Sequence, residues 1–157
     1  MKKLIFIITI LLAPTILLSQ NDKDEMYMNA FIVIADSSQV YSELKLKMFN
    51  LKDKLNVEID TMGRGYNKTK DLICLPENDE DEIYAGDYFP RRFPSETLSL
   101  EYLDYYDKKN GEKTIGLIVG IFQQKEKLNA ERLLKKLSEF FPNAYILNTD
   151  IYMGCMH

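Results

Sequence analysis

The apolar positions of this 157-residue chain fall into two blocks with the same internal order. In the first block, residues 31–34 form a short apolar run of the kind that a buried strand gives. Polar residues 36–38 follow, and any of them could cap the start of a helix. A second strand is predicted over residues 57–61. One face of the helix between these strands is predicted by the spacing of Val40, Leu44, Met48, Leu51 and Leu55.

The second block repeats this order near the C-terminus. A strand is predicted over residues 114–121, and a final strand over residues 144–147, after Pro142. Strand, helix and strand thus occur twice, which predicts an α+β fold of the ferredoxin-like, duplicated β-α-β type. Both helices would cover one face of an antiparallel sheet and leave the other face open. The second helical stripe comprises Ala130, Leu133, Leu134, Leu137, Phe140 and Phe141.

The stretch between the blocks, about residues 63–113, is predicted to be a long insertion. Its first part, residues 71–90, holds seven Asp and Glu residues and no Lys or Arg. Seven aromatic residues then crowd into residues 84–106, and Arg91 and Arg92 lie among them. The alternation over residues 97–103 predicts an extra, half-buried strand. A connection of this length inside a compact domain is usually functional or partly disordered.

The N-terminus has the layout of an export signal. Lys2 and Lys3 precede an almost wholly apolar run over residues 4–18, which is broken by Pro14 and followed by the small Ser19. A membrane-spanning helix needs about 20 apolar residues, so this run is short for one. We therefore expect residues 1–19 to be a cleaved signal and residues 20–157 to form one periplasmic or secreted domain, without a stable membrane span. An uncleaved N-terminal anchor is the alternative.

Export also affects the interpretation of the two cysteines, Cys74 and Cys155. In an oxidising compartment an even number of cysteines favours pairing, so a disulfide between them is predicted. Such a bridge would close a long loop and contribute about 4 kcal/mol in the chain-entropy model. Two separate buried thiols are the alternative.

Composition excludes several broad classes of protein. The formal net charge is −4, whereas a nucleic-acid partner requires a basic face. The hydrophobic content of 46% is too high for a wholly disordered chain. The length is too small for a barrel enzyme of about 250 residues.

Few residues offer catalytic or metal chemistry. The single histidine, His157, is the last residue, so a Ser–His or Cys–His pair would need a folded-back terminus. Cys155 and His157 supply two side chains where a closed zinc site uses four. The acidic run at residues 77–82 lacks the order of a calcium-binding loop. We predict no catalytic residues, no metal and no cofactor, although a carboxylate pair for glycoside cleavage stays open.

Recognition of a ligand is the remaining class of function. Aromatic rings can pack on the apolar faces of sugars, and arginine forks suit carboxylates. The alternative is that the rings form a satellite core while the arginines pair with nearby acids, and that Phe122 belongs to the core. The ligand-binding candidates are Tyr88, Phe89, Arg91, Arg92, Phe93, Tyr102 and Phe122.

One family resemblance points to a ligand. The segment Leu-Ile-Val-Gly-Ile-Phe at residues 117–122, and Asn-Ala-Glu followed by an amphipathic helix at residues 129–137, resemble the second half of a SPOR domain. Residues 144–147 match the last strand of that family. The resemblance implies an exported bacterial module with the doubled β-α-β fold, which binds peptidoglycan glycan strands on the open face of its sheet.

The sequence therefore predicts an exported, non-catalytic binding module whose ligand is cell-wall peptidoglycan glycan. The alternative is a periplasmic protein-interaction module that binds a basic partner through the acidic insertion. Exposed charges are screened beyond about 8–10 Å at physiological ionic strength, so binding of this second kind should weaken with salt.

Overall fold

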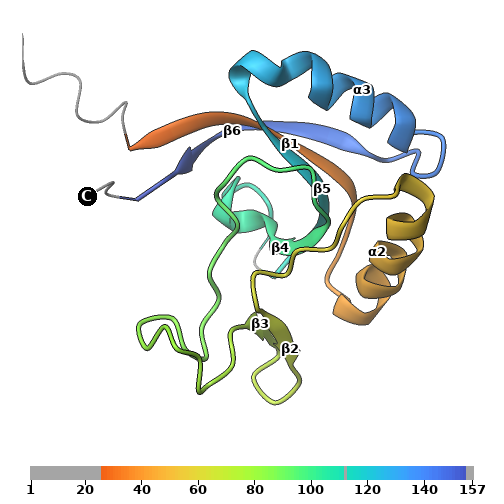
Figure 1. Ribbon diagram of the computed structural model, residues 1–157. Helices are drawn as coiled ribbons and strands as arrows, with labels where there is room; N and C mark the ends of the chain where they lie inside the picture. Colours follow the sequence, from red (N-terminus) through yellow and green to blue (C-terminus); the bar gives the residue numbers. More distant parts are fainter. Residues whose placement is uncertain (1–25, 112, 155–157) are drawn as a thin grey trace, which may run out of the picture.

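The chain folds as an antiparallel four-stranded sheet with two helices, in a computed structural model that describes residues 26–111 and 113–154 (Figure 1). The predicted α+β class is confirmed. The sheet has the order β4-β5-β1-β6, and all neighbouring strands are antiparallel. Its strands are β1 (Tyr27–Ser38), β4 (Ser99–Tyr102), β5 (Ile115–Gln123) and β6 (Tyr145–Tyr152), and the helices are α2 (Tyr41–Leu55) and α3 (Lys127–Leu137).

The strand order separates the two strands that flank α2. β4 pairs with β5 and does not neighbour β1, so β5 lies between the two strands of the first strand–helix–strand unit. β6 pairs with the other edge of β1. This is the connectivity of a split β-α-β arrangement.

Both helices pack on one face of the sheet. The stripe of α2 buries Leu44, Met48, Leu51 and Leu55 against sheet residues such as Val33. In contrast, Val40 lies at the helix start and is 53% exposed. The predicted polar caps do not cap this helix, because Ser38 Oγ accepts the N–H of Val40 and α2 begins only at Tyr41.

The second helix is shorter than its apolar stripe. α3 buries Ala130 and Leu137, and it ends before Phe140, which is exposed. The side chain of Leu133 lies against β5 at Gly120, where an added Cβ would be 3.3 Å from it. The absence of a side chain at Gly120 therefore allows α3 to approach β5 closely.

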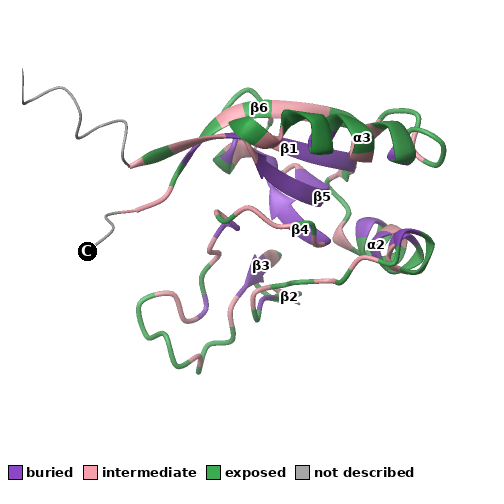
Figure 2. Ribbon diagram, turned by 45° about the horizontal axis from the view of Figure 1, so that its top comes forward, coloured by how far each residue is buried: buried purple, intermediate pink, exposed green. Residues whose placement is uncertain are grey.

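The opposite face of the sheet is filled, whereas the sequence predicted it to be open. Ile32, Ile34 and Ile118 are fully buried there, and Leu103 and Tyr106 pack over them. The chain achieves this because it turns directly after β4 into a short 3-10 helix, η1 (Leu103–Tyr105), which brings Leu103 and Tyr106 over these residues. Figure 2 shows how completely the central strands are buried.

The long insert, defined here as residues 56–98, connects α2 to β4. The strand predicted over residues 57–61 is wrong: only a single bridge, from Ile59 to Leu98, is formed there. The strand predicted over residues 97–103 is found as β4, but all four of its residues are buried and it belongs to the main sheet. The insert's own strands are β2 (Gly65–Asn67) and β3 (Leu72–Cys74), which pair as a small hairpin.

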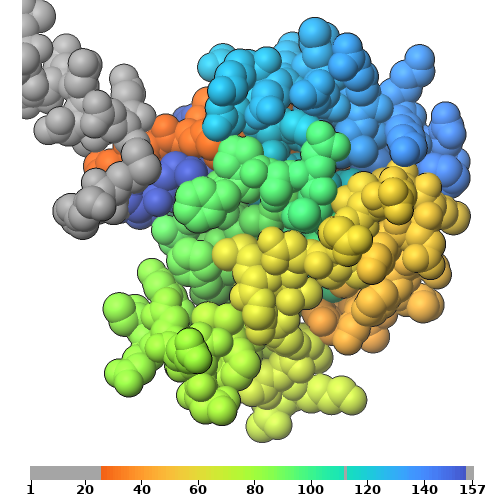
Figure 3. Space-filling model, in the orientation of Figure 1, coloured from red at the N-terminus to blue at the C-terminus, as the bar shows by residue number. Residues whose placement is uncertain are grey.

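The acidic part of the insert is a loop over residues 76–87 that projects from the body of the molecule (Figure 3). The predicted signal at residues 1–19 lies outside the described residues, as do Cys155 and His157. Cys74 is buried at the end of β3. The disulfide and the export signal therefore stay predictions. Within the described part of the chain, no helix is long and apolar enough to cross a membrane.

Candidate functional site

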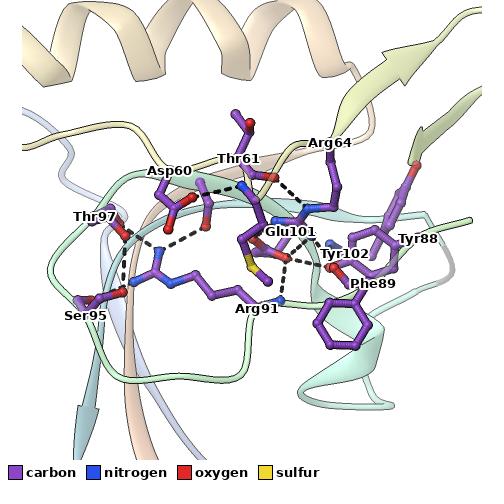
Figure 4. Close-up of polar contacts among 12 residues, drawn as sticks. Asp60, Thr61, Arg64, Tyr88, Phe89, Arg91, Ser95, Thr97, Glu101 and Tyr102 are labelled. Carbon is purple, nitrogen blue, oxygen red and sulfur yellow. Dashed lines mark hydrogen bonds and ion pairs between the residues drawn. The ribbon is translucent and has the colours of Figure 1, made fainter. Parts of the chain in front are cut away.

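A buried ion pair joins the insert to the sheet (Figure 4). Glu101 of β4 is completely buried and accepts two hydrogen bonds from Arg64, at 2.7 Å from Nη1 and 2.5 Å from Nη2. The same carboxylate accepts a hydrogen bond from the Tyr88 hydroxyl at 2.7 Å and another from the backbone N–H of Arg91 at 3.2 Å. Burial lowers the pKa of Arg64, but its hydrogen bonds and charge interaction with Glu101 outweigh burial and raise the pKa.

Arg91 is held by a second set of internal contacts. Its guanidinium donates to the carbonyls of Thr97 and Ser95, at 2.8 and 2.6 Å, and to the hydroxyl of Ser99 at 3.0 Å. Its own carbonyl accepts the hydroxyl of Tyr106 at 2.6 Å. Only 2% of Arg91 is exposed, and burial lowers the pKa of its side chain. The guanidinium therefore serves to hold the insert on β4.

Next to these contacts, three tyrosines surround a cavity. Tyr88, Tyr102 and Tyr105, together with Leu72, Asp104 and Lys113, line a pocket of about 280 Å³, which we call the tyrosine pocket. The ring of Tyr88 meets that of Tyr102 at 4.9 Å and 80°, and that of Tyr105 at 4.8 Å and 63°. Edge-to-face packing of this kind adds about 0.5–1.5 kcal/mol per pair.

Two of the three rings are locked from behind by hydrogen bonds. The Tyr88 hydroxyl donates to Glu101 and accepts the backbone N–H of Tyr102 at 3.1 Å. The Tyr102 hydroxyl accepts the N–H of Ile73 from the hairpin at 3.1 Å. Burial raises the pKa of Tyr88 well above its usual value, which keeps the hydroxyl protonated as the donor to Glu101. Tyr105, in contrast, is 58% exposed and is available to a ligand.

Polar groups at the pocket come from Asp104 and Lys113. Lys113 Nζ lies 3.0 Å from Asp71, in an exposed ion pair. One carboxylate oxygen of Asp104, Oδ1, is buried and has no hydrogen-bond partner among the described residues. The pocket thus combines aromatic surface with one acidic and one basic side chain.

A second group of aromatic residues surrounds Arg92. Its guanidinium lies over the ring of Phe89 at 4.6 Å and over that of Tyr152, on β6, at 5.7 Å. Tyr84 extends the row at one end, 4.7 Å from Phe89, and Tyr27 extends it at the other, 5.3 Å from Tyr152. Cation–π contacts at exposed sites contribute about 0.5–1 kcal/mol each.

The structure therefore divides the seven sequence candidates among different environments. Tyr88 and Tyr102 line the tyrosine pocket, and Phe89 and Arg92 belong to the aromatic row. Phe93 is exposed, and Phe122 is buried in the core on the helix-covered face. Arg91, within the insert, is buried against β4.

Sequence reasoning did not select Tyr105, Leu72, Asp104 or Lys113 as site residues. Tyr105 lies within the aromatic-rich stretch and had a local signal. No local sequence signal pointed to Leu72 or Lys113, because they lie about 30 residues before Tyr102 and about 10 residues after it in the sequence.

No protein-family model, curated protein or solved structure matches this chain. Within residues 26–111 and 113–154, no group of three or more His, Cys, Asp and Glu side chains could hold a metal ion. The described lining of the tyrosine pocket contains one carboxylate, that of Asp104. Its arrangement is suited to binding.

Proposed function

We propose that this protein is an exported, non-catalytic binding protein whose tyrosine pocket accepts one sugar ring of a glycan. Cell-wall peptidoglycan is the first candidate ligand. The observation that carries this proposal is the pocket itself, in which three tyrosine rings, one of them exposed, adjoin an acidic and a basic side chain.

The chemistry of a sugar matches this lining. A pyranose ring has an apolar C–H face that can pack on Tyr105, and its hydroxyls can donate to Asp104 and accept from Lys113. Small-molecule pockets usually have volumes of about 300–1,000 Å³, and 280 Å³ lies at the small end of that range. The pocket therefore suits a single ring within a chain and leaves the neighbouring rings outside.

The SPOR resemblance over residues 117–137 also favours a glycan. In that family the ligand lies on the open face of the sheet, but here Leu103 and Tyr106 occupy the corresponding face. The proposal therefore assigns the ligand to the tyrosine pocket.

Co-sedimentation of residues 20–157 with purified sacculi tests the proposal. Sacculi should retain the protein at low and high salt, and more strongly after an amidase removes the stem peptides. Tyr105→Ala should abolish retention, whereas Tyr105→Phe should preserve it because the ring remains. Tyr145→Ala is the matched control, since Tyr145 is an exposed tyrosine on β6 outside the pocket. Failure of intact and treated sacculi to retain the folded wild-type protein would reject a peptidoglycan ligand.

A second candidate function rests on the acidic loop. At its tip Ile83 is 81% exposed and follows four consecutive acidic residues, at positions 79–82. The loop is ordered by its own turns, because Asp81 accepts the N–H of Ile83 at 3.2 Å. An ordered acidic loop with an apolar tip suits a basic protein partner.

Binding of that kind would depend on charge and would be screened by salt. Retention of the protein on immobilised oligolysine should fall steeply with ionic strength and be weakened by Glu80→Gln with Glu82→Gln. The control Glu139→Gln, which removes an exposed carboxylate beyond α3, should have no effect. Equal retention of all variants would remove this candidate.

A further inference from the structure

A second and larger cleft lies where the insert meets the start of α2. Its volume is about 650 Å³, and it shares no lining residue with the tyrosine pocket. We call it the basic cleft. Its lining includes Gln39, Tyr41, Ser42 and Lys45 from the α2 side, and Tyr66 and Lys68 from the hairpin side.

Two stacked tyrosine rings form the wall of this cleft. Tyr41 and Tyr66 lie parallel, with centroids 4.4 Å apart and an interplanar angle of 9°. The Tyr66 hydroxyl donates to Asp71, which also binds Lys113, so this ring is held in place from the hairpin. Both tyrosines are only partly buried. The cleft therefore offers an aromatic surface that is already ordered before any ligand binds.

The charges around the cleft are unbalanced. Lys45 and Lys68 are exposed, and within the described residues no carboxylate lies within ion-pair distance of either. Lys45 Nζ lies 5.7 Å from the centre of the Tyr41 ring. Nearby lysines are paired: Lys47 with Glu43 and Lys70 with Glu77, each at 2.5 Å. Two exposed lysines, neither of them in an ion pair with a described residue, give this cleft a local positive charge in a chain of net charge −4, which favours an anionic ligand over a neutral one.

The acids closest in sequence to these lysines, Glu43 and Asp71, are bound to other residues. Glu43 is bound by Lys47, and this hydrogen bond lowers the pKa of Glu43. Asp71 is bound by Tyr66 and Lys113, which together lower the pKa of Asp71. The first backbone N–H groups of α2, which follow Val40 without a side-chain cap, add a small positive potential at the same place.

We propose that the basic cleft binds an anionic saccharide, whose ring packs on the tyrosine pair and whose acidic group lies between Lys45 and Lys68. A neutral sugar would leave both lysines without a counter-charge. An inorganic anion would make no use of the rings. Gln39 and Ser42 supply further polar groups for ring hydroxyls. The volume is sufficient for more than one sugar ring.

Titrations of residues 20–157 with three monosaccharides, followed by NMR, test this inference. Methyl glucuronide carries a carboxylate, glucose 6-phosphate carries a phosphate, and methyl glucoside is neutral. At least one of the two anionic sugars should bind more tightly than the glucoside and shift the ring resonances of Tyr41 and Tyr66. Comparison of the two indicates which acidic group the cleft prefers. Equal binding of all three sugars, or shifts elsewhere only, would overturn the inference.

Substitutions distinguish this site from the tyrosine pocket. Lys45→Gln and Lys68→Gln should each weaken binding roughly 2- to 5-fold, the range expected from loss of one exposed ion pair. Lys45→Arg should retain affinity, and Lys136→Gln, at an exposed position of α3, is the matched control. Tyr105→Ala should leave this binding unchanged, so failure here and failure of the proposed glycan function are separate results. Wild-type affinity in both Gln variants would refute the role of the lysines.

Discussion

The buried pair Arg64–Glu101 provides the sharpest test of how the insert is held. Glu101→Gln keeps the size of the side chain but removes its charge. The Arg64 guanidinium, whose side chain is 1% exposed, would then keep the carbonyls of Thr61 and Phe89 as acceptors but would lose its counter-ion. The amide would also place a donor where the carboxylate accepts from Arg64, Tyr88 and the N–H of Arg91.

The expected loss of stability is large. Removal of one partner of a buried ion pair typically costs about 3–5 kcal/mol, because the other charge stays buried without compensation. Domains of this size have total stabilities of about 5–15 kcal/mol. We therefore expect Glu101→Gln to lose about a fifth or more of its free energy of unfolding.

Urea denaturation followed by circular dichroism measures this loss. With a slope of about 1–3 kcal/mol per molar, the midpoint should fall by at least about 1 M. Glu58→Gln is the control, because the ion pair of Glu58 with Lys52 is long, at 3.6 Å, and exposed. It should leave the midpoint unchanged. A loss below about 1 kcal/mol for Glu101→Gln would show that leaving the buried charge of Arg64 without its counter-ion costs little stability, which would refute the reasoning.

A double variant separates the charge effect from packing. Arg64→Met combined with Glu101→Leu removes both charges and fills the site with apolar atoms, and such replacements are often neutral or stabilising. The double variant should therefore be more stable than Glu101→Gln. It should still be less stable than wild type, because Tyr88 and the N–H of Arg91 lose their acceptor. Equal stability of the double variant and Glu101→Gln would contradict the argument.

Two further predictions concern the other face of the sheet and the buried tyrosines. Gly116→Ala should lower the free energy of unfolding by about 1–3 kcal/mol, because the new Cβ would overlap the side chain of the buried Leu103. The control Gly65→Ala should not lower it, because there is open space around Gly65. Equal urea midpoints for the two variants would contradict this prediction. Burial raises the pKa of Tyr88 and of Tyr106 well above 10, so their contribution to stability is complete below about pH 10 and is lost as the pH rises towards their folded-state values. Absorbance at 295 nm should show a fraction of tyrosine that ionises above pH 10 only as the protein unfolds, and a single step near pH 10 in the folded protein would refute this.

The elements with strong local patterns could be predicted from the sequence. β1 and β5 have compact apolar runs, and α2 and α3 have apolar residues at helical spacing. These patterns can be recognised without knowing which element each segment packs against. Residues 57–61 and β4 could not be distinguished in this way. Both contain short apolar alternations, and pairing with β5 decides which becomes the strand.

The polar positions of β4 show why the site was only partly foreseen. In the alternation over residues 97–103, Ser99 and Glu101 have the pattern of a solvent-facing edge. They are completely buried, because Arg91 and Arg64 of the insert satisfy them. A sequence pattern does not distinguish a solvated carboxylate from one paired with an arginine 37 residues earlier. Tyr88 and Tyr102 were both among the ligand-binding candidates, but the sequence did not predict the pocket that they line, because the placement of Tyr88 depends on that pairing.

The start of β1 and the end of β6 lie side by side, so an attachment at either end would orient the domain in the same way. Tyr27 pairs with Tyr152, so the described chain begins and ends at one corner of the sheet (Figure 1). From there β1 extends for 12 residues, or about 35–40 Å, to the residues that open the basic cleft. An attachment at either end would therefore hold the basic cleft at the distal end of the domain, where it could reach a surface beyond the anchoring point.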